Sequence, residues 1–221
     1  MADGFEQMVD ASRSFFAELA QNNTKEWFNP RKAEYAENIK KPAEFLGDLI
    51  AEDLARVTGH PHKPKLFRIY RDVRFSKDKT PLNTHLHLMW SRVDATALDP
   101  AWFFGLAQEY FILGVGIMGM QGETLTRFRA HIDSNGAALQ RALEDGAANG
   151  VTLSDWGPPP LKNVPKPYDK DHPQAELLKR KALAVNVDIP ANWRQSGLVK
   201  AINTRITDLH PIAATMTPRP A

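Results

Sequence analysis

The chain of 221 residues contains no cysteine. This absence excludes disulfides, thiolate nucleophiles and cysteine-ligated zinc, and it fits a reducing compartment. The longest apolar run, at residues 110–120, is too short to cross a bilayer, and the first seven residues lack the basic and apolar regions of a signal peptide. We therefore expect a cytoplasmic protein without a membrane partner.

A strong excess of charge of one sign is also missing, since the formal net charge is only +2. Attraction for phosphates must then come from local clusters of cations, which argues against general DNA binding. Nucleotide-binding glycine motifs are missing too. Gly114 and Gly116 lie inside a strand pattern with no Gly-Lys-Ser/Thr after them, so they indicate a bulge or a close backbone approach. We predict no cofactor.

Three regions of hydrophobic pattern follow one another: a helical region at 1–58, a sheet region at 63–120, and helices plus a polar loop at 122–221. The helical spacing of the first region gives way to a period of two in the second. Helices, then strands, then helices is the order of an α+β protein. We predict a single domain over 1–221, with a mostly antiparallel sheet of about four or more strands packed with N-terminal and C-terminal helices.

Local signals set the expected ends of these elements. Asn23 with Glu26 forms a capping-box pattern for a short helix, and Gly59 ends the first helical region. Asn135 and Gly136 predict a break between two later helices. The segments expected to be strands are 65–75, 84–93, 102–107 and 110–118, with 183–187 as a further candidate.

The most informative segment is 63–79, which holds seven Lys or Arg and two Asp within an apolar alternation. In a strand, Arg68, Asp72 and Arg74 would share one face, while Phe75 would lie on the apolar face. Asp72 would then hold two guanidinium groups in the geometry that recognises a phosphate or a carboxylate. The spacing predicts an anion-binding site on this strand.

Arg71 falls on the apolar face of the same predicted strand. Either a bulge re-aims it, or it is buried and paired with Asp78 or with Glu26 from the helical region. The alternative interpretation of the whole cluster is a lattice of ion pairs that ties the strand to the helices. The two roles are compatible, because residues that order a site also order a fold.

Further candidates follow this segment. Lys79 would add a point charge at the mouth of the anion site, unless it belongs to an ordinary solvated turn. His85 and His87 would project from one strand face, which suits a metal pair, but the sequence fixes no third ligand. We predict no metal site and assign His85 to the arginine site as a hydrogen-bonding member.

A second polar stretch, at residues 162–173, is rich in Lys, Tyr, Asp and His. Lys166 and Tyr168 would close over a polar ligand. Asp171 and His172 would either supply a general base or cap a helix that starts at Pro173. No nucleophile accompanies them, so the catalytic candidates are Asp72 and His172, and the sequence leaves open whether the protein is an enzyme.

Three stretches resemble a bacterial family classified as a conserved domain of unknown function. They are N-N-x-x-E-W-F at 22–28, F-R-I-Y-R-D-x-R-F-S-x-D-K-x-P at 67–81 and P-K-x-Y-D-x-D-H-P at 165–173. The resemblance covers most of the chain in order and implies a single α+β domain, but no activity. The chain departs from the family pattern at residues 82–83, Pro167 and residues 119–120, each of which touches a candidate loop.

The leading functional hypothesis is a cytoplasmic protein that binds a small phosphate- or carboxylate-bearing molecule, and that acts on it if it is an enzyme. The proposed ligand-binding residues are Arg68, Arg71, Asp72, Arg74, Asp78, Lys79, His85, Lys166, Tyr168, Asp171 and His172.

Two alternatives remain. The first is a nucleic-acid-associated protein, whose basic stripe would join 63–79 to residues 160–221, where ten Lys or Arg stand against five Asp or Glu. The second is a structural or partner-binding domain in which every motif charge is paired internally. The oligomeric state is open.

Overall fold

The computed structural model of the chain describes residues 4–217. Two parts of the sequence-based predictions therefore lie outside the described residues. They are residues 1–3, which belong to the stretch compared with a signal peptide, and Arg219, which belongs to the basic segment 160–221. Within residues 4–217, no helix combines the length and the apolar character that crossing a membrane requires.

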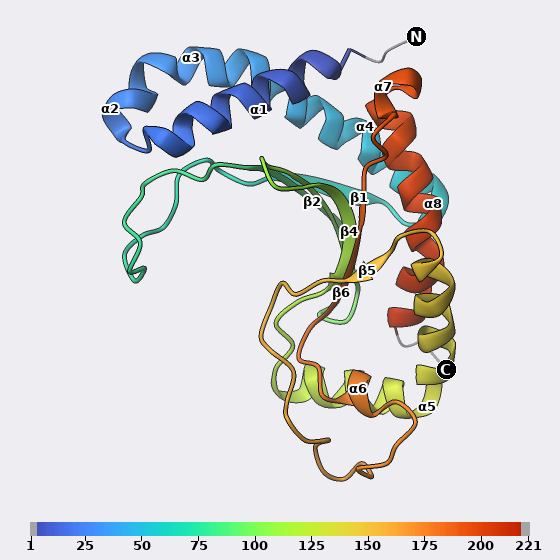
Figure 1. Cartoon of the computed structure of the whole chain (residues 1–221). Coiled ribbons are helices and arrows are strands. Elements are labelled where there is room, and N and C mark those ends of the chain that lie inside the picture. The colour runs from blue at the N-terminus through green and yellow to red at the C-terminus, as the bar shows by residue number, and fades with distance from the viewer. Residues whose placement is uncertain (1–3, 218–221) are drawn as a thin grey trace.

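Helices of the N-terminal region form a layer above the sheet (Figure 1). They are α1 (Glu6–Gln21), α2 (Lys25–Phe28), the 3-10 helix η1 (Asn29–Arg31), α3 (Lys32–Tyr35), the π-helix η2 (Ala36–Lys40) and α4 (Lys41–Thr58). As expected, α4 ends at Gly59, which has a φ of 74° that glycine adopts without strain.

The cap of α2 differs from the prediction by one residue. The Thr24 side chain, rather than Asn23, accepts a hydrogen bond from the Trp27 amide at 3.2 Å. Asn23 is engaged elsewhere, because its amide nitrogen donates to the Leu82 carbonyl at 2.8 Å and its oxygen accepts from the Leu82 amide at 3.1 Å. Asn23 therefore ties the helical layer to residues 67–82.

One antiparallel sheet of six strands, in the order β1-β2-β3-β4-β6-β5, forms the centre of the molecule. The strands are β1 (His62–Leu66), β2 (Leu86–Arg92), β3 (Ala101–Leu106), β4 (Phe111–Ile117), β5 (Thr152–Leu153) and β6 (Leu183–Asp188). This confirms the predicted α+β class and the antiparallel sheet packed with N-terminal and C-terminal helices. The candidate strand at 183–187 is β6.

The strand predicted at 65–75 is wrong beyond Leu66. Residues 67–82, which we call the excursion, leave the sheet as an irregular arm whose neck is a single bridge between Tyr70 and Leu82 (Figure 1). Phe75, expected on the core face, is 97% exposed. Arg71 and Arg74 pair with aspartates of the arm itself, as described below, so they do not need the partners that a sheet position would give them.

The break predicted at Asn135 and Gly136 is also wrong, because α5 (Gly122–Ala147) is one continuous helix. Gly136 is buried in its middle, where a Cβ atom would lie 2.7 Å from the Gln174 Cγ. Glycine at this position therefore permits close packing and does not end the helix. The chain continues with α6 (Ala175–Leu178), α7 (Trp193–Ser196) and α8 (Leu198–Met216).

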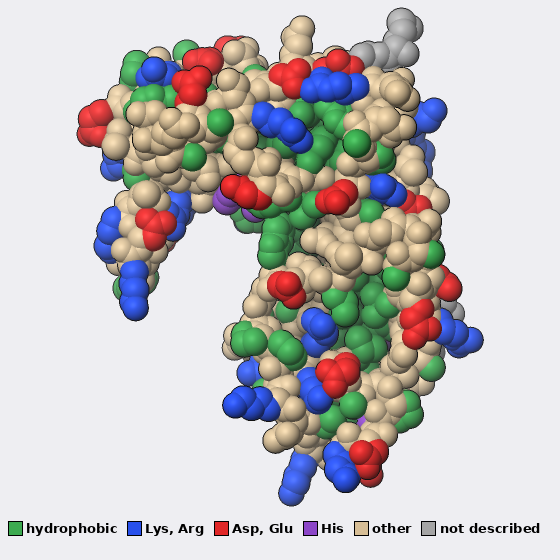
Figure 2. All heavy atoms as spheres, viewed as in Figure 1, with side chains coloured by type: hydrophobic (Ala, Val, Ile, Leu, Met, Phe, Trp, Pro, Cys, Tyr) green, Lys and Arg blue, Asp and Glu red, His purple; other side chains and the backbone are tan. Residues whose placement is uncertain are grey.

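The two faces of the sheet have different surroundings. Helices α4 and α8 pack on one face, where the Trp90 indole nitrogen donates to the Gly47 carbonyl of α4 at 2.8 Å. The buried apolar side chains form one core cluster on this side. The other face borders a deep hollow between the excursion and the lobe of α5 and α6 (Figure 2). The fold thus leaves His87, which alternates with buried neighbours along β2, on the hollow side.

Candidate functional site

Arg71 makes the main internal contact of the excursion. Its Nη1 donates to the Asp78 carboxylate at 2.6 Å, to the Thr80 carbonyl at 3.1 Å and to the Thr80 hydroxyl. Of the two partners considered from the sequence, Asp78 is the one observed. The Thr80 amide, with help from Arg71, lowers the pKa of Asp78 to about 2, so this carboxylate is ionised at neutral pH.

Arg74 forms the second pair. Its Nε and Nη2 donate to the two carboxylate oxygens of Asp72 at 2.9 and 2.7 Å. Asp72 was expected to hold two guanidinium groups, but among the described residues only Arg74 forms hydrogen bonds to it. These bonds lower the pKa of Asp72, and the charge of Arg68 lowers it further. Lys79 also forms a hydrogen bond within the excursion, since its Nζ donates to the Val73 carbonyl at 3.0 Å.

Arg68, the remaining arginine of the motif, lines a pocket of about 460 Å³ between the excursion and the helical layer. We call it the Arg68 pocket. Its polar lining residues are Lys32, Tyr35, Lys40, Glu44, Arg68 and Tyr70. Four of these six come from the helical layer and two from the excursion, so the pocket depends on how the chain leaves the sheet after β1.

Two cations of the Arg68 pocket form no ion pair with an acidic residue among the described residues. In the described part of the chain, neither the Lys32 nor the Arg68 side chain forms an ion pair or a hydrogen bond. Lys40 is only loosely held by Glu44, at 3.7 Å between Nζ and Oε1. The pocket therefore carries more positive than negative charge, and two of its charges are available to a ligand.

Tyrosines add uncharged donors to this pocket. Burial, with the charge of Glu44, raises the pKa of Tyr35 to about 12, so its hydroxyl keeps the proton. Phe28 packs edge-on against the Tyr35 and Tyr70 rings, with centroids 5.7 Å away in both cases. These contacts fix the two rings as walls of the pocket.

The π-helix η2 shapes the same wall. Its first and last residues, Ala36 and Lys40, both line the pocket. An extra residue in a helical turn changes which side chains share a face, and single π turns are often found at functional sites. Here the π turn brings the Lys40 ammonium to the face that meets Arg68.

A second group of titratable side chains lies on the hollow side of the sheet. The His85 and His87 rings stack with centroids 3.9 Å apart, and the His87 Nε2 is 2.7 Å from the Tyr110 hydroxyl. Trp156 and Phe67 border the His87 ring at 5.6 and 6.3 Å. Sequence reasoning singled out His85 but missed Tyr110, because only the pairing of β2, β3 and β4 brings its ring over Gly105, the residue opposite His87.

Both imidazoles are neutral at physiological pH. Burial lowers the pKa of His87 to about 3, with a smaller effect from His85. Burial and the charge of Arg71 lower the pKa of His85, against the opposing effect of Glu109. The charge of Arg71 thus acts on the His85 imidazole. Among the residues that the structure describes, no three His, Asp or Glu side chains are arranged to hold a metal ion.

The second polar loop lies at the other end of the hollow. The His172 Nδ1 accepts from the Gln174 amide at 2.9 Å, and its Nε2 is 3.1 Å from the Asp133 carboxylate of α5. His172 therefore supports the turn before α6, which begins at Ala175 and not at Pro173. The Asp171 amide donates to Asp169 at 2.8 Å.

The two groups of predicted site residues do not meet. Lys166, Tyr168, Asp171 and His172 belong to the lobe of α5 and α6, where the Tyr168 ring packs 6.4 Å from that of His172. The excursion lies across the hollow from this lobe (Figure 1). Within residues 4–217, no hydrogen bond or ion pair joins the two groups. The structure places Arg71, Asp78 and His85 together, and Arg68 in a separate pocket.

Comparison with known proteins adds one finding about the chain as a whole. A family model described as "Conserved hypothetical protein (DUF2461)" matches residues 11–214. That match includes the excursion, the Arg68 pocket and the second polar loop. A comparison with curated proteins gave no match.

Proposed function

The chain belongs to the conserved hypothetical protein family DUF2461, and we propose that it binds a small anionic molecule, bearing a phosphate or a carboxylate, in the Arg68 pocket. One observation carries the proposal. Arg68 and Lys32, from segments that are distant in sequence, line the same pocket, and neither forms an ion pair in the described part of the chain. Two unpaired cations that face one space attract an anion.

The donors of this pocket suit an oxyanion. Arg68 offers a planar fork for two acceptor oxygens, and Lys32 offers a compact point charge. The Tyr35 hydroxyl remains protonated and can donate a further hydrogen bond. A volume of about 460 Å³ falls within the usual range for small-molecule sites and suits a ligand of modest size.

The other two arginines of the motif do not suit this role. Arg71 and Arg74 are each neutralised by an aspartate of the excursion, at 2.6 and 2.7 Å. A ligand that binds Arg71 or Arg74 would have to displace the carboxylate that already pairs with it. Arg71 and Arg74 therefore fit the alternative of internal pairing, and Arg68 is the member of the motif that fits ligand binding.

A nucleic-acid role has less support. On the face shown in Figure 2, Lys and Arg side chains alternate with Asp and Glu and do not gather into a stripe. Binding along a phosphate backbone requires several cations in a row. The Arg68 pocket has only three cationic lining residues in the described part of the chain, grouped around one cavity and not in a row.

The proposal is tested by thermal shift and calorimetry with inorganic phosphate, a sugar phosphate, a nucleoside monophosphate and a dicarboxylate. A ligand at 100 times its Kd raises the free energy of unfolding by about 2.7 kcal/mol. Because a hydrogen bond to a charged group contributes about 1.5–3 kcal/mol, Arg68→Gln and Lys32→Gln should each weaken binding about tenfold or more.

Arg74→Gln is the matched control, because Arg74 belongs to the same motif but is paired with Asp72 and is largely exposed. It should leave the affinity unchanged. The proposal fails if none of the anions stabilises the protein, or if Arg74→Gln weakens binding as much as Arg68→Gln does.

A further inference from the structure

The Arg68 pocket has more room than a single anionic group needs. Its volume of about 460 Å³ lies in the range of sites that hold whole small molecules. Its cations are surrounded by five lining residues with purely apolar side chains, Phe28, Ala36, Leu66, Phe67 and Ile69. The space around the anion therefore suits the apolar body of a larger ligand.

Tyr70 brings an exposed aromatic ring to this pocket. The residue is 36% exposed, whereas Phe28, which its ring meets edge-on at 5.7 Å, is only 1% exposed. No other aromatic ring within residues 4–217 packs on Tyr70. The contact with Phe28 thus fixes the Tyr70 ring and leaves part of it uncovered, so a flat apolar group has a surface on which to pack.

The hydroxyl of Tyr35 also points to a ligand. Tyr35 is 7% exposed, and its hydroxyl forms no hydrogen bond with the residues that the structure describes. The hydroxyl oxygen is not sealed inside the protein either. Buried polar groups normally have a partner, and because Tyr35 lines the pocket, that space is where a partner can lie.

Four donor side chains of the pocket are thus without a hydrogen-bond partner in the described part of the chain: Lys32, Tyr35, Arg68 and Tyr70. A phosphate monoester offers three acceptor oxygens and a charge of about −1.5 to −2 at pH 7. A carboxylate offers two oxygens and a single charge. Two cations and two hydroxyls therefore match a phosphate better than a carboxylate.

We propose that the ligand of the Arg68 pocket is an aryl phosphate, a phosphate monoester that carries a flat aromatic ring. This inference rests on the proposed function, because it concerns the same site. Lys32 and Arg68 bind the phosphate oxygens, and the Tyr35 hydroxyl donates to one of them. The aromatic ring of the ligand packs on Tyr70.

Calorimetry of the wild-type chain with phenyl phosphate, methyl phosphate, benzoate and inorganic phosphate tests the proposal. Phenyl phosphate should bind about ten- to hundredfold more tightly than methyl phosphate, because binding removes the ring from water. It should also bind about tenfold more tightly than benzoate, which has the ring but a single charge. Equal affinity in either comparison overturns the assignment without any variant.

Variants of the two tyrosines assign the roles. Tyr70→Leu should remove most of the preference for phenyl over methyl phosphate, whereas Tyr70→Phe should keep it. Tyr35→Phe should weaken both phosphates alike, by about fivefold, because one hydrogen bond is lost. Phe75→Leu is the matched control, since Phe75 belongs to the same excursion but is 97% exposed and lies outside the pocket. If Phe75→Leu removes the preference as Tyr70→Leu does, the role of Tyr70 is wrong.

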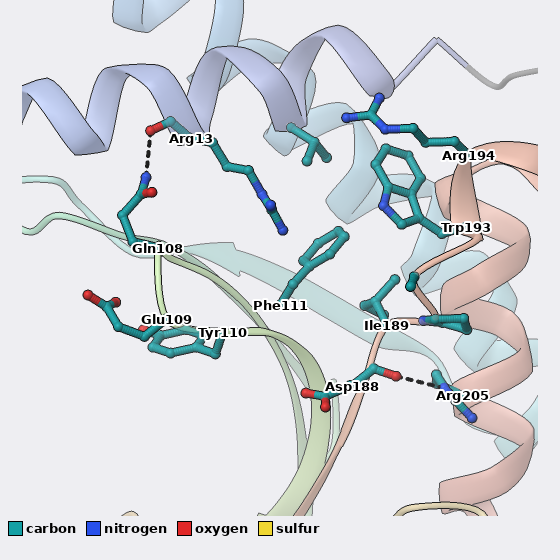
Figure 3. A pocket seen from close by; sticks show the side chains of 13 residues that line it. Arg13, Gln108, Glu109, Tyr110, Phe111, Asp188, Ile189, Trp193, Arg194 and Arg205 are labelled. Atoms are coloured by element: carbon teal, nitrogen blue, oxygen red, sulfur yellow. Dashed lines mark hydrogen bonds between the residues drawn. The ribbon is translucent and has the colours of Figure 1, made fainter.

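A larger pocket, of about 680 Å³, provides a control for the cations. It lies beside α1, the turn from β3 to β4 and the segment that joins β6 to α7 (Figure 3). Two of its arginines, Arg194 and Arg205, form ion pairs with aspartates. The third, Arg13, lies 5.6 Å from the centroid of the Phe111 ring. Arg13→Gln should leave the affinity for phenyl phosphate unchanged, and a loss as large as in Arg68→Gln would place the ligand elsewhere.

The ligand series also separates this inference from the proposed function. If methyl phosphate binds, Arg68→Gln weakens it and the phenyl group adds nothing, the anion site stands and the aryl phosphate assignment fails. If none of the four compounds binds, the anion site fails together with the assignment. Tighter binding of phenyl phosphate that is lost in both Arg68→Gln and Tyr70→Leu supports the two proposals together.

Discussion

His87 shows how the surroundings of one side chain set its chemistry. It lies on the hollow side of β2, stacked on His85 and 2.7 Å from the Tyr110 hydroxyl. Burial lowers the pKa of His87 to about 3 and raises that of Tyr110 to about 12. Both groups are therefore neutral over the physiological range, and the hydrogen bond between them does not depend on ionisation. Gly105 permits this arrangement, because a Cβ atom there would lie 3.0 Å from the Tyr110 ring.

The low pKa of His87 predicts a pH dependence of stability. The unfolded chain takes up a proton near the ordinary value of 6.5, whereas the folded chain resists it down to about pH 3. The unfolded state thus binds more protons in this window, and the contribution to stability, complete above pH 6.5, is lost as the pH falls towards 3. The slope should approach about 1.4 kcal/mol per pH unit. Urea unfolding at pH 7, 6 and 5 measures it.

His87→Gln provides the comparison, because glutamine can still bond to Tyr110 but does not titrate. The variant should show a flatter dependence between pH 7 and 5 than the wild type. Carboxylates and His85 titrate in both proteins, so their effects cancel in the difference. Equal slopes in the two proteins would contradict this prediction, because they would mean that the pKa of His87 is the same in the folded and the unfolded chain.

Among the elements, the pair of β4 and β6 has the least room for change. Gly116 lies opposite Ala184, and a Cβ atom on it would come within 2.4 Å of the Ala184 Cα. Of the two interpretations made from the sequence, this is the close backbone approach. Gly116→Ala forces the strands apart and should lower the free energy of unfolding by about 2 kcal/mol or more, measured by urea unfolding.

Gly119→Ala is a suitable control two residues after β4. A Cβ atom there meets nothing within 4 Å, although the φ of 63° favours glycine. The expected loss is about 1 kcal/mol, from backbone conformation alone. If Gly119→Ala costs more than Gly116→Ala, the contact between β4 and β6 is not as close as described.

The elements differ in how far the sequence predicts them. β2 was predictable because buried apolar residues alternate along it, and β3 and β4 because they are short, uncharged apolar runs punctuated by glycine. The excursion has the same alternation, but the period cannot distinguish a strand from an extended arm whose charges pair locally. Gly136 was misread as a break because its reason, the contact with Gln174, is tertiary.

The Arg68 pocket was predicted only in part, because its residues come from segments that are distant in the sequence. The density of cations at 63–79 drew attention to Arg68, and the spacing favoured Asp72 as its partner. The actual neighbours, Lys32 and Tyr35, lie on a helix more distant in the chain and have no local signal that links them to a strand.

The molecule as a whole is open. Its accessible surface is 12371 Å², against about 10,200 Å² for a compact monomer of 24.8 kDa. The excess agrees with the hollow in Figure 2. Small-angle scattering should give a radius of gyration measurably above the value of about 17 Å for a compact domain of this length.

A variant in which a short glycine linker replaces residues 72–79 removes one wall of the hollow. Its radius of gyration should fall towards the compact value, while its far-ultraviolet circular dichroism stays close to that of the wild type. A wild-type radius already at about 17 Å would mean that the excursion and the lobe of α5 and α6 close over the hollow in solution.

The strand order has a consequence for the growing polypeptide. β4 pairs on one side with β3, its predecessor, but on the other with β6, which is made only after α5, β5 and α6. All seven residues of β4 are buried in the finished sheet. At about 5–20 residues per second, an apolar edge therefore waits several seconds on the ribosome for its neighbour, and this is the period when the nascent chain is most exposed to wrong pairing.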